Sequence, residues 1–173
     1  MNSSRDQLQE QAVRQAIACA IDRQEVVDSA ILGEGEVTGP WTIPAYAGDP
    51  YAGLPCDGAD PEMAEQMLAD AGVETPISLN TIVMTGGYAT AVNEAQSLQA
   101  QLSAIGVELE LEQLETNVYV DRWLAGDFDA AVALNGGRPD PHLMYVRYFT
   151  SDGNLNDVAQ YSSDELDQLF AEG

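Results

Sequence analysis

A change of hydrophobic period along residues 77–111 constrains the fold of this chain more than any other feature. Apolar residues alternate from Ile77 to Val83, recur at helical spacing from Ala91 to Ile105, and alternate again over 107–111. The outer patterns are typical of strands, and the middle one of an amphipathic helix. Strand, helix and strand in this order form a right-handed crossover with parallel strands. The chain is therefore predicted to be an α/β protein.

Two helices are predicted before this crossover. Apolar residues recur at three- and four-residue spacing from Val13 to Ile31, which indicates one long helix over about residues 8–32, closed by glycine. Asp60 is a cap residue and Pro61 suits the first helical position, so a second helix is predicted over 61–71, ending at Gly72.

The second half of the chain predicts a further buried strand and three helices. The expected elements are a short helix capped by Asn117, a strand over 128–134, and helices over 141–148 and 163–170. The last helix stops almost as soon as its apolar face begins. We therefore expect residues 1–173 to be a single lobe of a longer protein.

The charge of the chain excludes several function classes. The chain has 29 Asp and Glu residues, six arginines and no lysine, which gives a formal net charge of −23. The absence of lysine rules out a P-loop and a Schiff-base mechanism. With no basic stripe, neither nucleic acid nor an anionic membrane surface is an expected partner. The longest wholly apolar stretches have five residues, far short of the ~20 that span a bilayer.

The N-terminus and the two cysteines leave alternatives open. Residues 1–5 lack the basic and apolar regions of a secretory signal, so either the protein is cytoplasmic or the sequence begins downstream of the true start. Cys19 lies in an apolar run and is interpreted as a small buried hydrophobic residue. Cys56 lies in a Pro- and Gly-rich loop over 39–58, interpreted either as a cover over the core or as a ligand wall. The cysteines are expected to be unpaired, although a bridge remains possible.

Most recognisable chemical motifs are absent or incomplete. His142 is the only histidine, which excludes any metal motif with two histidines, and it is expected beside a helix cap. The acidic run over 152–157 has Asp157 where a calcium loop requires glycine, so we interpret it as a turn. Glu108, Glu110 and Glu112 share one strand face and are expected to be solvated, because same-face neighbours lie roughly 7 Å apart.

One loop carries plausible binding chemistry. Asn135, Gly136, Gly137, Arg138 and Asp140 follow the predicted buried strand, at the end where open α/β sheets bind ligands. The two glycines allow close approach of backbone to a ligand, and an arginine fork suits a carboxylate. A tight turn whose arginine offsets local acidity is the alternative. Tyr88, after the first strand, is predicted to lie on the same rim.

Several motifs, in order and spacing across nearly the whole chain, resemble the peptide/nickel class of extracellular solute-binding proteins. They are Val13–Ala18, Ala20–Arg23, Thr38–Pro40, Asp60–Gly72, Leu98–Val107, Gly126–Asp129 and Tyr161–Asp167. The resemblance implies one lobe of a periplasmic-binding-protein-like receptor that binds a peptide, oligosaccharide or similar solute and delivers it to an ABC permease. It further implies a first lobe elsewhere in the same chain, a periplasmic or cell-surface lipoprotein location, a monomer, and neither cofactor nor catalysis.

Two positions depart from the pattern of that class. Its peptide-binding members hold the ligand's amino terminus with an aspartate where this chain has Gly137, and its nickel-binding members use a tryptophan where this chain has Asn135. With Arg138 nearby, an anionic or hydroxyl-rich ligand is favoured instead.

Two other readings compete with a binding lobe. One is a small hydrolase that uses His142 or the pair Asp127 and Asp129, where an apolar run could raise one carboxyl pKa. The other is a structural acidic protein of a high-salt cell, which explains the charge but not the loop.

Overall fold

The computed structural model describes residues 1–39, 48–134 and 140–172. A three-stranded parallel sheet forms its centre, in the order β2-β1-β3. The strands are β1 (Ile77–Met84), β2 (Val107–Leu114) and β3 (Ala130–Val132), and α5 (Ala91–Ser103) connects the first two. This is the predicted βαβ crossover, in the register Ile77 opposite Val107. The α/β fold class predicted from the sequence is confirmed.

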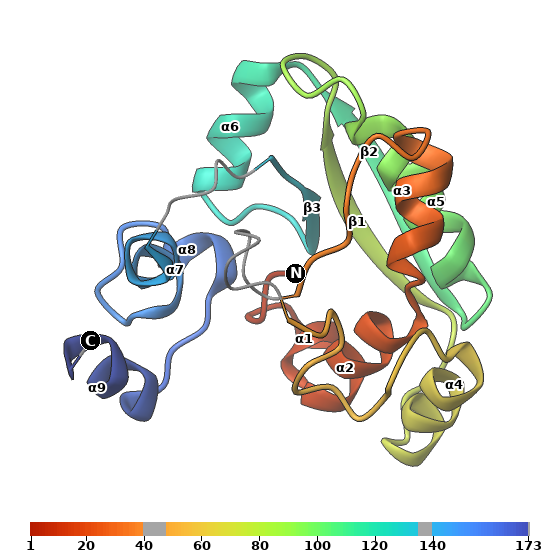
Figure 1. The fold of residues 1–173 in the computed structure, drawn as a ribbon, viewed down its shortest axis with the longest axis horizontal. Helices are drawn as coiled ribbons and strands as arrows, with labels where there is room; N and C mark the ends of the chain where they lie inside the picture. Colours follow the sequence, from red (N-terminus) through yellow and green to blue (C-terminus); the bar gives the residue numbers. More distant parts are fainter. Residues whose placement is uncertain (40–47, 135–139, 173) are drawn as a thin grey trace.

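Alternating side chains give the two faces of the sheet different partners. On one face, Ile77 and Leu79 pack with Val107 against α2 (Gln11–Ala20), α4 (Pro61–Asp70) and α5. On the other, Ile82 packs against Tyr119 of α6 (Thr116–Leu124) and against Phe128. Helices therefore cover both faces, and Figure 1 shows α6 on the opposite side of the strands from α5.

The prediction of one continuous helix over residues 8–32 is wrong. The chain forms α1 (Asp6–Gln9), α2 and α3 (Arg23–Ala30), with breaks at Glu10 and at Ile21–Asp22. The physical reason is local. The Asp22 carboxylate accepts hydrogen bonds from the backbone N–H groups of Gln24 and Glu25, at 2.9 and 3.0 Å, and so starts a new helix. Periodicity alone missed this cap.

Most of the remaining elements are close to their predicted ranges, but α8 was not predicted. Asp60 caps α4, with Pro61 in its first turn, as expected. The helix predicted to be capped by Asn117 begins at Thr116, and the strand predicted over 128–134 pairs only over β3. The last helices are α7 (Pro141–Phe149), α8 (Asn156–Ala159) and α9 (Asp164–Glu172), and they form the blue end of the chain in Figure 1. The turn predicted at Asp152 is confirmed.

The cysteines form a disulfide, which corrects the expectation that they are unpaired. Cys19 in α2 and Cys56 in the loop before α4 are joined, with their Cα atoms 6.0 Å apart. The same loop is held by Tyr51, whose hydroxyl donates to the Ile21 carbonyl at 2.9 Å and whose ring lies under the Arg23 guanidinium. Residues 48–58 therefore cover the α2–α3 junction. Residues 40–47, the other part of the predicted loop, lie outside the described residues.

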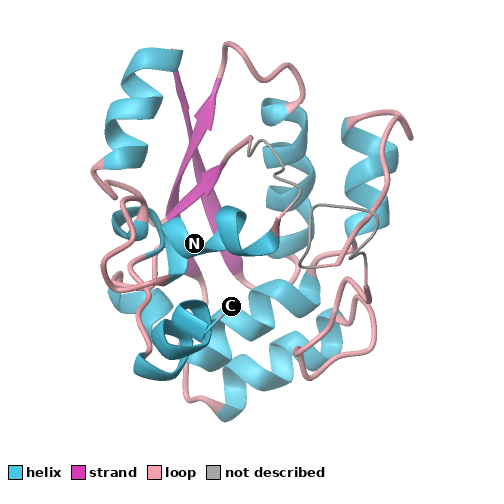
Figure 2. Cartoon of the chain, turned by 60° about the vertical axis from the view of Figure 1, so that its left-hand side comes forward, coloured by secondary structure: helices cyan, strands magenta, loops and turns pink. Residues whose placement is uncertain are grey.

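None of the helices in the described ranges is both long enough and apolar enough to cross a bilayer. Figure 2 shows the strands between helices on either side, with α9 at the surface near the end of the chain.

Candidate functional site

The sheet has its topological switch point between β1 and β3. From β1 the chain crosses over to β2 on one side and then reaches β3 on the other. Val83 pairs with Val132, so the carboxyl ends of both strands lie at the same edge. Open parallel sheets bind ligands in the crevice outside such strand ends. Residues 85–90 follow β1 at this edge and include Tyr88, and the other five residues predicted for the site follow β3 in the sequence, between Leu134 and α7.

Tyr88 lies on this edge, as the sequence predicted. Its ring packs against the cluster formed by Val83, Ala91, Ala95 and Val132, which includes the ends of both strands. Its hydroxyl donates to Glu94 Oε2 at 2.5 Å, and Thr90 Oγ1 donates to the other oxygen at 2.6 Å. Burial, followed by the hydrogen bond and the charge of Glu94, raises the pKa of Tyr88 to about 12. The phenol therefore stays protonated, and its oxygen can still accept a hydrogen bond.

The other five predicted residues are described only in part. Asp140 begins α7, and its carboxylate accepts a hydrogen bond from the His142 N–H at 2.9 Å, as a helix cap. His142 is thus beside a cap, as expected. Asn135, Gly136, Gly137 and Arg138 lie outside the described residues, so their part in a site stays a prediction.

Tyr119 supports the edge from α6. Its side chain is buried, and its hydroxyl donates to the Val132 carbonyl at 2.9 Å. This hydrogen bond ties Val132, the last residue of β3, to α6 and so holds the end of the strand in place. Burial, with a smaller effect from Tyr88, raises the pKa of Tyr119 to about 12. The sequence did not single out this residue, because a tyrosine on an amphipathic helix looks like any other core aromatic.

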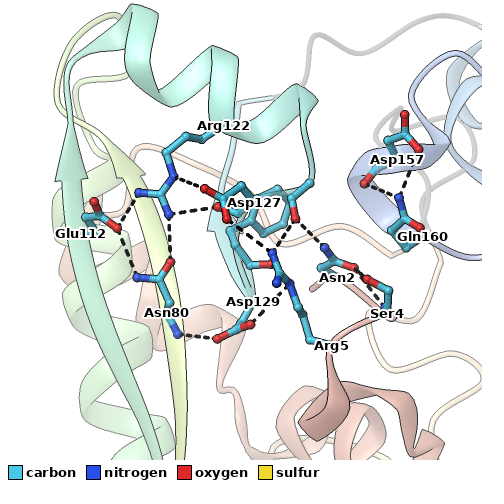
Figure 3. Close-up of polar contacts among 12 residues, drawn as sticks. Asn2, Ser4, Arg5, Asn80, Glu112, Arg122, Asp127, Asp129, Asp157 and Gln160 are labelled. Carbon is cyan, nitrogen blue, oxygen red and sulfur yellow. Dashed lines mark hydrogen bonds and ion pairs between the residues drawn. The ribbon is translucent and has the colours of Figure 1, made fainter.

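Two arginines hold the turn that leads into β3. Arg5 donates to the carbonyls of Phe128 and Gly126, at 3.0 and 2.8 Å. Arg122 forms an ion pair with Glu112 at 2.6 Å and with Asp127 at 3.1 Å, and Figure 3 shows both guanidinium groups converging on this turn. The contact with Arg122 lowers the pKa of Glu112. Of the three strand glutamates, Glu112 is thus paired rather than simply solvated.

A glycine in the same turn is required by its surroundings. Gly126 has a φ of +65°, and a Cβ there would lie 2.6 Å from the Asp157 carbonyl oxygen. Its own carbonyl accepts hydrogen bonds from Arg5 and from the buried Asn2 side chain. The beginning of the chain, the turn before β3 and α8 are therefore packed together.

The geometry gives little support to the alternative hypothesis that the chain is a hydrolase using His142 or the pair Asp127 and Asp129. Asp127 and Asp129 lie in a turn and not on a strand, and each faces an arginine: both approach Arg5, and Asp127 also pairs with Arg122. The His142 ring packs edge-on against Phe170 at 5.6 Å. Within residues 1–39, 48–134 and 140–172, no three His, Cys, Asp or Glu side chains are grouped as metal ligands would be.

An aromatic wall was not foreseen from the sequence. Trp123 of α6 meets Tyr148 of α7 edge-to-face at 6.4 Å, and Tyr145 stacks on Phe149 at 6.0 Å. With Leu134, these residues line a cavity of about 330 Å³ beside the end of β3. The i, i+3, i+4 spacing of the three α7 aromatics was a readable signal, but it is equally typical of a core face.

The half-buried phenol of Tyr88 and the buried phenol of Tyr119 make the electrostatics of this edge testable. We expect Tyr88 and Tyr119 to ionise only near pH 12, because burial disfavours the phenolate. Both folded pKa values lie above the unfolded value of about 10, so the stability they contribute is present below pH ~10 and is lost as the pH rises towards 12. Phenolate absorbance measures the titration, and Tyr88→Phe should remove one late-titrating group. An unchanged late phase in that variant would contradict the assignment.

Comparison with known proteins places these observations in a family. Residues 1–157 match the family described as bacterial extracellular solute-binding proteins, family 5 middle. Di/tripeptide-binding protein 3 of Pseudomonas aeruginosa is 28% identical over 95% of this chain and 31% of its own length. The chain thus spans about a third of the length of the curated relatives it matches.

Solved structures agree in fold. A putative peptide-binding protein, AppA, from Clostridium difficile superposes with a TM-score of 0.82 at 26% identity, over 99% of this chain and 36% of that one. HbpA2 from Haemophilus parasuis superposes with a TM-score of 0.84 at 21% identity, over 99% and 35%. With residues 1–157 matched by the family model and its fold shared, the chain belongs to the family 5 extracellular solute-binding proteins.

Proposed function

We propose that residues 1–173 are the second, ligand-binding lobe of a longer two-lobe receptor. That receptor would capture a peptide, an oligosaccharide or a similar solute outside the cytoplasm and deliver it to the permease of an ABC importer, without catalysis. Family membership supports this proposal, as do the peptide-binding names of the relatives and the one-third coverage of their length.

The observation that carries the proposal is the switch point at the ends of β1 and β3. Tyr88, held by Glu94, presents a fixed hydroxyl on one side of this edge. Asn135 to Arg138 follow the end of β3 in the sequence, and in our proposal they lie on the other side of this edge. In our proposal the Arg138 guanidinium binds a carboxylate or hydroxyl groups of the solute, and the two glycines let backbone N–H groups approach it.

Two-lobed receptors bind by closing about a hinge, so binding groups come from both lobes. One lobe supplies only part of them. The lobe by itself should therefore bind the complete solute weakly, and high affinity should require the longer protein.

Native mass spectrometry of the longer protein, purified from its source, tests the proposal. We expect a retained small molecule, and a rise in thermal midpoint when that molecule is added back, with no rise for the 173-residue chain. Arg138→Ala in the longer protein should lower affinity at least tenfold, a typical loss for a charge-assisted contact. Arg23→Ala is the matched control, because Arg23 packs on Tyr51 and should leave affinity unchanged.

Two results would contradict the proposal. One is binding of the solute by the 173-residue chain as tightly as by the longer protein. The other is a longer protein that retains nothing and shows no stabilisation with peptides, oligosaccharides or metal complexes.

A further inference from the structure

The proton of the Tyr88 hydroxyl is directed at Glu94. Tyr88 donates to Glu94 Oε2 at 2.5 Å, and Thr90 donates to Glu94 Oε1 at 2.6 Å. A carboxylate has no proton to give, so both hydroxyl protons are turned towards it. The hydroxyl of Thr90 has only one proton, which its hydrogen bond to Glu94 uses. The oxygen of Tyr88 is therefore left with lone pairs for any further partner.

The backbone that carries Tyr88 is tied to the start of α6. The N–H and the hydroxyl of Thr85 both donate to the Leu114 carbonyl, at 3.0 and 3.1 Å. The Thr116 hydroxyl donates to the Gly86 carbonyl at 3.1 Å. A Cβ at Gly86 would lie 2.9 Å from Thr116 Oγ1, so this close approach needs a glycine. The loop from β1 to Tyr88 is therefore held on the side of α6.

Helix α5 holds Glu94 on the other side. Glu94 lies in the first turn of α5, where its backbone N–H donates to the Thr90 carbonyl at 2.9 Å. A negative charge is favourable there because the N-terminus of a helix is electropositive. Glu94 is also the only charged residue within Ala91–Ser103. The helix itself is tied to the end of α3, since Asn93 donates to the Ala30 carbonyl at 3.4 Å. The carboxylate thus has a fixed place between the two hydroxyls.

We propose that Glu94 is a positioning residue that makes Tyr88 a hydrogen-bond acceptor for the solute. The inference rests on the proposed function, because it names the kind of solute group that binds at this side of the sheet edge. A hydroxyl, an amide N–H or an ammonium group meets the requirement. A carboxylate or carbonyl oxygen does not, because two acceptors would face each other with no proton between them. The negative charge behind Tyr88 acts in the same direction.

The direction of the hydroxyl can be measured without a solute. In Raman spectra, the intensity ratio of the tyrosine Fermi doublet distinguishes a phenol that donates a strong hydrogen bond from one that mainly accepts. We expect the difference between the longer protein and its Tyr88→Phe variant to show a strong donor. In a Glu94→Gln background this donor character should weaken, because the charged acceptor is lost and an amide can also donate to Tyr88. Glu65→Gln is the matched control, an exposed glutamate on α4 whose loss should leave the Tyr88 signal unchanged.

Probes that differ in one donor test the consequence for binding. Trialanine and maltotriose represent the peptides and oligosaccharides of the proposed function. In the altered trialanines an ester oxygen replaces one peptide N–H, and in the altered maltotrioses a fluorine, which has no proton to donate, replaces one hydroxyl. For the parent probe that the longer protein binds, at least one such replacement should weaken binding roughly tenfold, because the Tyr88 oxygen then faces a group without a proton. Tyr88→Phe should remove that difference.

The effect of Glu94 on affinity should pass through Tyr88. By calorimetric titration with the same parent probe, Tyr88→Phe should weaken binding roughly three- to tenfold, as expected for one hydrogen bond. Glu94→Gln should also weaken binding, and the double variant should bind no more weakly than Tyr88→Phe alone. Additive losses would mean that Glu94 acts on the solute independently of Tyr88.

The inference would be overturned by a Tyr88 phenol that does not donate, by a doublet unchanged in Glu94→Gln, or by additive losses. Failure of the proposed function gives a different result. If the doublet shows a donor that depends on Glu94 but the longer protein binds neither parent probe, the role of Glu94 stands and the proposed solute classes fail. If a parent probe binds but no donor replacement weakens it, the binding role stands and this inference fails.

Discussion

Reduction of the disulfide between Cys19 and Cys56 is expected to lower the free energy of unfolding by about 3–4 kcal/mol. The bond closes a loop of sequence separation 37, and cross-linking removes conformational freedom from the unfolded chain roughly as the logarithm of loop length. In a protein of this size each kcal/mol corresponds to a thermal midpoint shift of about 2–4 °C, so a fall of roughly 6–16 °C is expected.

Thermal unfolding with and without a phosphine reductant measures this effect. The chain has only these two cysteines, so a reductant has no other bond to act on. The double variant Cys19→Ala and Cys56→Ala should unfold near the midpoint of the reduced protein and should not respond to the reductant. An equal midpoint for the oxidised and reduced wild-type protein would contradict the prediction.

The sequence was sufficient for those elements whose signal is local. The change of period from Ile77 to Leu111 predicted β1, α5 and β2 and their parallel pairing, and Asp60 with Pro61 predicted the start of α4. The break at Asp22 was also local, but its cap signal lies inside an apolar period that continues through it. Helix propensity and the hydrophobic period favoured one continuous helix there, but the Asp22 cap starts a separate helix.

Contacts between distant residues could not be read in the same way. The pairing of Cys19 with Cys56 depends on a Cα separation of 6.0 Å that no spacing rule supplies. Likewise, Arg122 lies ten residues from Glu112 in the chain but meets it only because α6 folds back over the sheet.

For the candidate site, the sequence predicted which edge of the sheet is involved, but not the aromatic side chains that lie beside it. Strand ends predicted that Tyr88 would lie on the same rim as the end of β3, and Tyr88 packs against the cluster that includes Val132. The aromatic wall of Trp123 and Tyr148 joins two helices 25 residues apart, so it required the packing angle of α6 against α7. Periodicity identifies an apolar face, but only the fold shows whether another element fills it.

Salt is expected to stabilise this protein strongly. The net charge of −23 creates repulsion that is relieved when the chain unfolds and expands. The Debye length falls from about 30 Å at 0.01 M salt to about 3 Å at 1 M. Even roughly 0.2 kcal/mol of repulsion for each surplus charge amounts to about 4–5 kcal/mol that screening removes. Salt also weakens ion pairs such as Arg122–Glu112, but an exposed pair contributes only about 0–1 kcal/mol, so the relief of repulsion prevails.

Urea unfolding followed by tryptophan fluorescence, in sodium chloride from 0.01 to 1 M as above, measures this dependence. Salt also strengthens burial of apolar surface, so charge variants are needed to separate the two causes. Replacing the exposed Glu34, Glu36, Glu65 and Glu74 by Gln should raise the urea midpoint at low salt and reduce its rise with salt. Glu112→Gln is the matched control: it also removes a negative charge, but one paired with Arg122, so it should lower stability. If the four-residue variant responds to salt as steeply as the wild-type protein, charge repulsion is not what the salt relieves.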